Sequence, residues 1–248
     1  MKITFLDCLF VMLTLCTCTS GLWAQDRNTM DGLTFTSDSN TPSHASTTQP
    51  NAEASRAQVS AQLKEPVILN FDKLPGPLWE TWDCGDGIGN SGPSHGILTI
   101  DASSCYEFGL WHPNGKWHKL VNNARGWIIE AGLKVDPITE PACNGDRGSV
   151  LIWANDHTNL IIIGFSTNEI SIAYPDYVRF PMDTTNAFHI YRIESKGNRV
   201  KVYVDGDLKI NHILSWTGGG SDVLTFGDGD GCGTSLSYWD YFSYDVFP

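Results

Sequence analysis

Residues 198–206, NRVKVYVDG, decide the fold class of this chain. Three valines alternate there with Arg, Lys and Tyr, and a period of two is typical of a β-strand with one buried face. The pairs Gly197-Asn198 and Asp205-Gly206, which enclose the strand, are typical of tight hairpin turns. Because the flanking segments also alternate, the sequence predicts three antiparallel strands, at 188–195, 198–206 and 207–213.

The rest of the chain beyond residue 65 has the same character. Short apolar segments recur between turn signals, and no long amphipathic helix pattern appears. Further strands are predicted at 66–72, 96–103, 105–110, 126–135, 149–156, 158–166, 168–174, 222–228 and 236–246. Roughly twelve short strands in this arrangement predict an all-β fold, a two-sheet antiparallel jelly-roll sandwich.

The chain divides into three predicted parts. Residues 1–24 read as a secretory signal peptide, with Lys2 at the start, a short apolar run and Ala24 at the cleavage site. Residues 25–65 are rich in Ser, Thr, Asn and Gln and predict a disordered linker, because they contain few large apolar residues. Residues 66–248 form the single predicted domain.

The formal net charge of -12 limits the classes of partner. It disfavours nucleic acid and anionic membranes, which both require clustered Lys and Arg. It suits a secreted protein, extracellular or periplasmic, and no membrane insertion is expected.

Four of the seven cysteines remain after removal of the signal peptide, namely Cys84, Cys105, Cys143 and Cys232. An even number in an exported chain predicts two disulfide bonds. Pairing Cys84 with Cys105 and Cys143 with Cys232 is preferred because the first pair closes the shortest loop, and unpaired buried thiols are the alternative.

Three segments resemble one known family. YRIESKGNRVKVYVDGDLKI at 191–210 resembles the hairpin of concanavalin A-like lectin/glucanase domains, including the laminin-G-like group. GWIIEAGLKV at 126–135 and FGDGDGCGTSLSYWDYFSYD at 226–245 resemble another strand and the closing segment of that family. The resemblance covers residues 66–247 and implies a concanavalin A-like sandwich whose last strand returns beside the first. It does not select a function, because this fold hosts lectins, binding modules, hydrolases and lyases.

Acidic, glycine-rich stretches at 83–87 and 227–231 have the composition of Ca²⁺ loops but not the spacing of an EF-hand. Turns are therefore the preferred interpretation of both stretches. The resemblance implies a structural calcium ion between the first and last strands, and the matching positions are Asp72 and Asp240.

Tryptophans in predicted loops and strand ends are candidates for stacking on sugar rings. The loop 110–118, LWHPNGKWH, offers two Trp and two His. The alternative is a hairpin around residues 113–115 whose Trp rings pack on the sandwich, and the strand residues Trp127, Trp153 and Trp239 are expected in the core. The predicted ligand-binding residues are Trp82, Trp111, His112, Trp117, His118 and Glu130.

No catalytic residue is assigned from the sequence. Glycosidases need two carboxylates at a defined separation, and the resemblance implies a run E-x-D-x-x-E that this sequence lacks. Glu130 is therefore expected to act as a hydrogen-bonding residue. His189 and Tyr191 share a strand face, as a lyase acid–base pair would, but are expected to be core or sheet-surface residues.

The preferred function is non-catalytic, lectin-like binding of a polysaccharide or other glycan by an exported domain. One alternative is a polysaccharide lyase or glycoside hydrolase of the same fold. The other is a structural or adhesive protein that meets a cell-surface protein.

Overall fold

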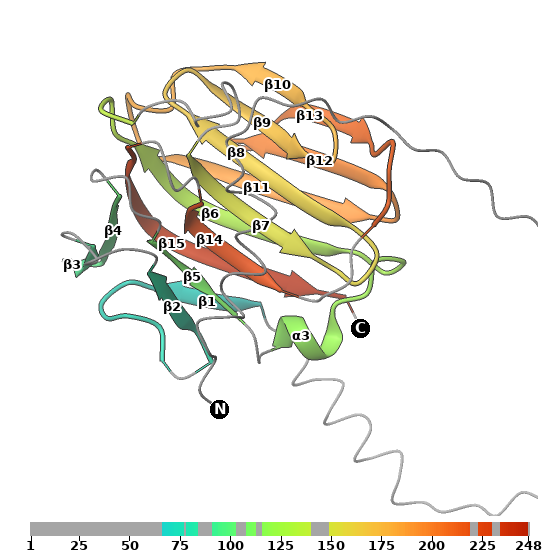
Figure 1. Cartoon of the computed structure of the whole chain (residues 1–248), viewed down its shortest axis with the longest axis horizontal. Coiled ribbons are helices and arrows are strands. Elements are labelled where there is room, and N and C mark those ends of the chain that lie inside the picture. The colour runs from blue at the N-terminus through green and yellow to red at the C-terminus, as the bar shows by residue number, and fades with distance from the viewer. Residues whose placement is uncertain are drawn as a thin grey trace, which may run out of the picture. The chain divides into compact units, whose positions relative to one another are not determined.

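In the computed structural model, two antiparallel sheets lie face to face (Figure 1). The structure describes residues 66–76, 78–83, 91–102, 108–112, 116–139, 149–218, 223–229 and 234–247. The predicted signal peptide, the predicted linker and all four cysteines of the predicted disulfide bonds lie outside these residues. No helix in the described part is long and apolar enough to cross a membrane.

The first sheet contains the hairpins that were predicted from the opening stretch. Its last strand, β15, lies between β6 on one side and β4 and β1 on the other, so the last of the described strands returns beside the first of them, as predicted. In spatial order this eight-stranded sheet contains β13 (Asp207–Ile213), β12 (Arg199–Val204), β11 (His189–Lys196), β6 (Trp127–Val135), β15 (Leu236–Val246), β4 (Ile97–Asp101) and β3 (Gly92–Ser94), with β1 (Val67–Asn70) also paired to β15.

The second sheet has a late segment of the chain among its interior strands. Strand β14 lies between β5 and β7, although these two strands are far from it in the sequence. In spatial order the seven-stranded sheet contains β10 (Val178–Pro181), β9 (Glu169–Tyr174), β8 (Leu160–Ser166), β7 (Val150–Asn155), β14 (Leu224–Asp228), β5 (Phe108–Trp111) and β2 (Glu80–Asp83).

The turns of the β11–β12–β13 meander follow from their residues. Gly197 has a φ of 61° at the first position of the β11–β12 turn, where a type II′ hairpin favours glycine. Asp205 and Gly206 have φ values of 52° and 87°, so both central positions of the β12–β13 turn are left-handed, as a type I′ hairpin requires. The predicted three-strand meander is confirmed.

The core fills the space between the two sheets with large aromatic rings. Phe226 of β14 stacks on Phe242 of β15, with ring centroids 4.2 Å apart, and Trp239 packs against both. Trp127 meets Trp117 edge-on at 5.2 Å. The core prediction is confirmed for Trp127 and Trp239, which are almost completely buried.

Three of the four terminal strands of the sheets differ from the prediction. Strands β2, β3 and β10 were not predicted, and all three are terminal strands of their sheets. They are short, two of them contain Pro, and such features are typical of edge strands. The segment after the expected hairpin at 113–115 forms the short helix α3 (Lys116–Leu120).

Candidate functional site

Two half-buried tryptophans lie on one transverse row of the seven-stranded sheet, on the face turned away from the core. Thr225 of the interior strand β14 pairs with Trp111 on one side and with Trp153 on the other. The residues before and after each of them point into the core, so these three side chains face outward. The two rings therefore stand two strands apart, about 10 Å at ~4.8 Å per strand.

A third ring joins this row because of a β-bulge. Trp153 pairs with Ile162 of β8, and Ile162 pairs with Tyr174 of β9. The register then shifts, so that Ile163 pairs with Ile172, and Ile172 is completely buried. Without the bulge Tyr174 would share the inward face of Ile172, and the extra residue turns it outward. Trp111, Trp153 and Tyr174 are called the aromatic row below.

Few charges accompany the aromatic row. Among the described strand residues of this sheet the only Lys or Arg is Arg179, which pairs with Glu169 at 3.6 Å and lies over the Tyr177 ring. Glu80 of β2 lies directly opposite Trp111. Five strand steps separate β2 from β9, about 24 Å at ~4.8 Å each, so Glu80 and Glu169 are too far apart for a glycosidase pair, which needs about 5–9.5 Å.

The structure separates the six residues predicted to bind a ligand. Trp111 lies in the aromatic row, and the backbone of Trp82 pairs with Gly109 in the same sheet, while its side chain lies outside the described part. His118 is exposed on α3. Glu130 lies on the outer face of the other sheet, so it cannot share one binding surface with Trp111.

His112 and Trp117 are core residues, and their predicted contact with a sugar is not supported. Both are at most 1% exposed, so neither ring has a face open to a ligand. The Nδ1 of His112 donates to the carbonyl of Leu78 at 2.8 Å, its Nε2 accepts from the Tyr244 hydroxyl at 2.8 Å, and Trp79 stacks on its ring. This agrees with the alternative that the rings of 110–118 pack on the sandwich.

The buried His112 predicts a loss of stability in mild acid. Burial is the main cause that lowers the pKa of His112, and the bond to Leu78 opposes it. A histidine with a lowered folded pKa binds more protons when unfolded, so its contribution is complete above the unfolded pKa of about 6.5 and declines as the pH falls below it. Urea midpoints between pH 8 and pH 5 should show this decline.

The variant His112→Gln provides the control for that measurement. It should be less stable than the wild type at pH 8, because it loses a buried hydrogen bond. Its urea midpoint should nevertheless depend less steeply on pH between 7 and 5. The difference between the two slopes isolates His112 from the other histidines. Identical slopes would show that His112 does not cause the loss of stability in mild acid.

Glu130 is held in a network of polar side chains on the eight-stranded sheet. The Tyr241 hydroxyl donates to its Oε1 at 2.9 Å, and Arg192 lies 3.8 Å from its Oε2. Arg192 also donates to Glu194 at 3.0 Å. Burial, together with the bond to Glu130, raises the pKa of Tyr241. These contacts agree with the expected hydrogen-bonding role of Glu130.

The two predicted calcium ligands lie in the eight-stranded sheet near the place where β1 and β4 succeed each other along β15. Asp240 is exposed at a register shift in β15, where the neighbouring strand changes from β1 to β4. Asp72 is exposed just beyond the end of β1. No group of three His, Cys, Asp or Glu side chains that suits a metal occurs in the described ranges, so the calcium site stays a prediction.

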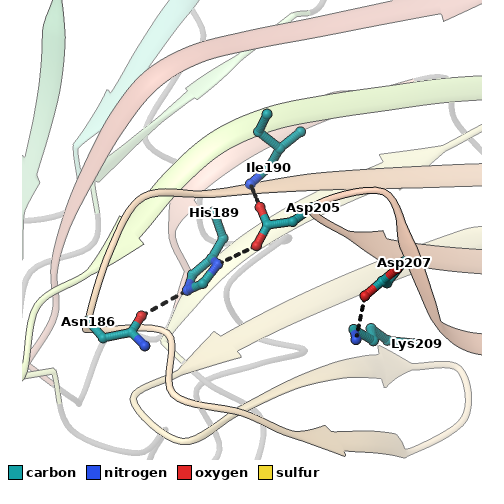
Figure 2. A network of polar contacts seen from close by, with 6 residues as sticks. All are labelled: Asn186, His189, Ile190, Asp205, Asp207 and Lys209. Carbon is teal, nitrogen blue, oxygen red and sulfur yellow. Dashed lines mark hydrogen bonds and ion pairs between the residues drawn. The ribbon is translucent and has the colours of Figure 1, made fainter.

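A shallow depression of about 280 Å³ lies where β10 approaches the β12–β13 hairpin. Figure 2 shows its polar wall, in which His189 lies between Asn186 Oδ1 at 2.9 Å and Asp205 Oδ2 at 2.7 Å. Asp205 also accepts from the backbone N–H of Ile190 at 2.9 Å (Figure 2). The network thus ties the β12–β13 turn to the start of β11. Because Tyr191 is completely buried, no His189–Tyr191 acid–base pair is presented to a substrate.

Sequence reasoning missed two members of the aromatic row. Trp153 was expected in the core, which is wrong, because the strand 150–155 is apolar on both faces and its alternation does not show which face is buried. Tyr174 faces outward only through a register shift between two strands, and no pattern within one strand reveals such a shift.

No family model matches this chain, and no curated protein matches it. Solved structures do match. One comes from work on cell entry of botulinum neurotoxin type C, which depends on interaction with two ganglioside molecules (TM-score 0.50, 12% identity, covering 77% of this chain and 50% of that chain).

Two enzymes have slightly lower scores. They are a β-glucanase of Bacillus licheniformis (TM-score 0.47, 16% identity, 73% of this chain and 98% of that one) and the catalytic domain of a laminarinase, an endo-1,3-β-glucanase, from Thermotoga petrophila (0.47, 16%, 75% and 100%). At such identities these likenesses concern the fold alone. The chain has the predicted two-sheet, concanavalin A-like sandwich.

Proposed function

We propose that this chain is an exported protein that holds a neutral polysaccharide against the aromatic row without cleaving it. One observation carries the proposal, namely that Trp111 and Trp153 stand on either side of Thr225 on the outward face of the sheet. An indole ring covers the apolar C–H face of a pyranose, and a half-buried indole is both fixed in place and accessible.

Charge favours a neutral glycan over an anionic one. The chain has a net charge of -12. Arg179 is the only Lys or Arg among the described strand residues of this sheet, and it is already paired with Glu169. A uronate or a sulfated sugar would therefore meet repulsion, and the described strand residues of this sheet leave no unpaired cation to offset it. The separation of Glu80 and Glu169 supports binding without hydrolysis, because these two carboxylates cannot act on one glycosidic bond.

The test is affinity electrophoresis through gels that contain soluble neutral polysaccharides, namely β-1,3-glucan, mixed-linkage β-glucan, xylan and galactomannan, with polygalacturonate as the anionic control. We expect retardation by at least one neutral polymer. Trp111→Ala and Trp153→Ala should each weaken binding at least tenfold, the size expected for truncating an aromatic hot spot. Phe188→Ala removes a ring of 44% exposure away from the row and should bind as the wild type does.

The same panel distinguishes binding from catalysis. Incubation with each polymer should release no new reducing ends and no unsaturated products. Release of either product would establish the enzyme alternative. Unchanged retardation of both Trp variants would show that the aromatic row is not the binding surface.

A further inference from the structure

Trp216 is a half-exposed tryptophan whose ring is nevertheless held in place. It follows β13 and exposes 49% of its surface. The Tyr174 ring meets it nearly at right angles, with centroids 5.8 Å apart. On another side the indole lies against the backbone of Gly218, where an added Cβ would come within 2.0 Å of two ring carbons. Trp216 is therefore the neighbour of the last ring of the aromatic row.

Asp176 fixes the chain beside this ring. It lies in the turn that follows Tyr174, and its Oδ2 accepts from the backbone N–H of Ser215 at 2.8 Å. The same oxygen contacts His212 Nε2 at 2.8 Å, and Oδ1 accepts from the Ser215 hydroxyl. These bonds tie the residue before Trp216 to the turn after Tyr174, so the two rings keep their relative position.

This arrangement fits a ligand better than it fits stability alone. Fixing a large side chain costs conformational entropy, and an indole that stays half exposed recovers only part of that cost through burial. A ligand that binds a ring already held in position does not have to order it, which improves affinity. The bonds of Asp176 and the close approach of Gly218 thus preorganise an aromatic surface at the edge of the site.

We infer that Trp216 is a further stacking platform that extends the aromatic row, and that the site takes an extended chain of several neutral sugar rings. This inference rests on the proposed function. From Trp111 to Tyr174 the row spans four strand steps, about 19 Å at ~4.8 Å each, and Trp216 lies beyond it. That length exceeds a single pyranose ring, so affinity rises with the number of linked units until Trp216 is covered.

The test is calorimetry with linear β-1,3- and β-1,4-linked glucose and xylose oligosaccharides of two to six units. The wild type should bind a hexasaccharide more tightly than the disaccharide of the same series. Trp216→Ala should lower hexasaccharide affinity about tenfold and change disaccharide affinity less than twofold. Gly218→Ala, which displaces the ring without removing it, should reproduce the loss, and Trp216→Phe should restore part of the affinity.

Gly76→Ala is the matched control for the glycine variant, because a Cβ at Gly76 meets nothing within 4 Å. If Trp216→Ala and Gly218→Ala bind the hexasaccharide like the wild type while Trp111→Ala loses binding, Trp216 is not a stacking platform and the proposed function stands. If the wild type binds none of these oligosaccharides and no neutral polymer retards it, or if Trp111→Ala and Trp153→Ala bind as well as it does, both proposals are overturned. A protein partner then becomes the occupant to seek for this face.

Discussion

Replacing Asp156 with alanine should lower the free energy of unfolding by roughly 3–5 kcal/mol, because it removes the acceptor of two buried and two part-buried hydrogen bonds. Asp156 is 1% exposed and follows β7. Its Oδ2 accepts from Trp127 Nε1 at 2.8 Å and from Asn123 at 3.1 Å. Its Oδ1 accepts from the backbone N–H groups of Asn159 at 2.7 Å and Thr158 at 3.2 Å.

Urea unfolding followed by tryptophan fluorescence measures this effect. Asp183→Ala is the matched control, since Asp183 also accepts two bonds from a residue two positions later, but on the exposed surface. There water replaces the lost acceptor, and the change should be much smaller than for Asp156. Equal losses in the two variants would show that the burial of Asp156 does not matter.

Trp117→Ala should cost about 3–5 kcal/mol of stability and leave glycan binding by the folded molecules unchanged. The Trp117 ring is completely buried, meets Trp127 at 5.2 Å and Tyr244 at 5.8 Å, and donates from Nε1 to the carbonyl of Asn155 at 2.9 Å. Its removal leaves a large cavity and one unsatisfied carbonyl in the core.

Trp111→Ala provides the reciprocal control for that prediction. Its ring is only half buried on the outer face, so its loss should reduce binding at least tenfold and stability much less than the loss of Trp117. Thermal unfolding and affinity electrophoresis on the same two samples measure both properties. A Trp117 variant that is stable but does not bind would place this residue back in the ligand site.

The central strands, their turns and the edge strand β13 could be predicted from the sequence, and the other terminal strands of the two sheets could not. The valines of β12 and the enclosing turns show their period and boundaries within one short segment. In contrast, β3 reads Gly-Pro-Ser, which is a turn signal, and it is a strand because β4 offers a free edge. The short helix α3 is likewise not visible in the pattern of 110–118.

The candidate site was predictable only in part, because it depends on which strands become neighbours. Trp111 and Trp117 were both predicted to bind a ligand, but only Trp111 faces outward, and Trp117, six residues later, is buried in the core. The composition of one loop does not distinguish these two environments. Trp153 and Tyr174 join the row through the pairing of β7 with β14 and through the bulge in β9, and both are properties of the assembled sheet.

The position of β14 has a consequence for the newly made chain. A nascent polypeptide that has emerged as far as Gly218 already contains every ring of the row, yet Trp111 and Trp153 have no strand to hold them side by side. The aromatic row is therefore assembled only after β14 has been made, and a product cut short before Leu224 would carry the aromatic residues without the row.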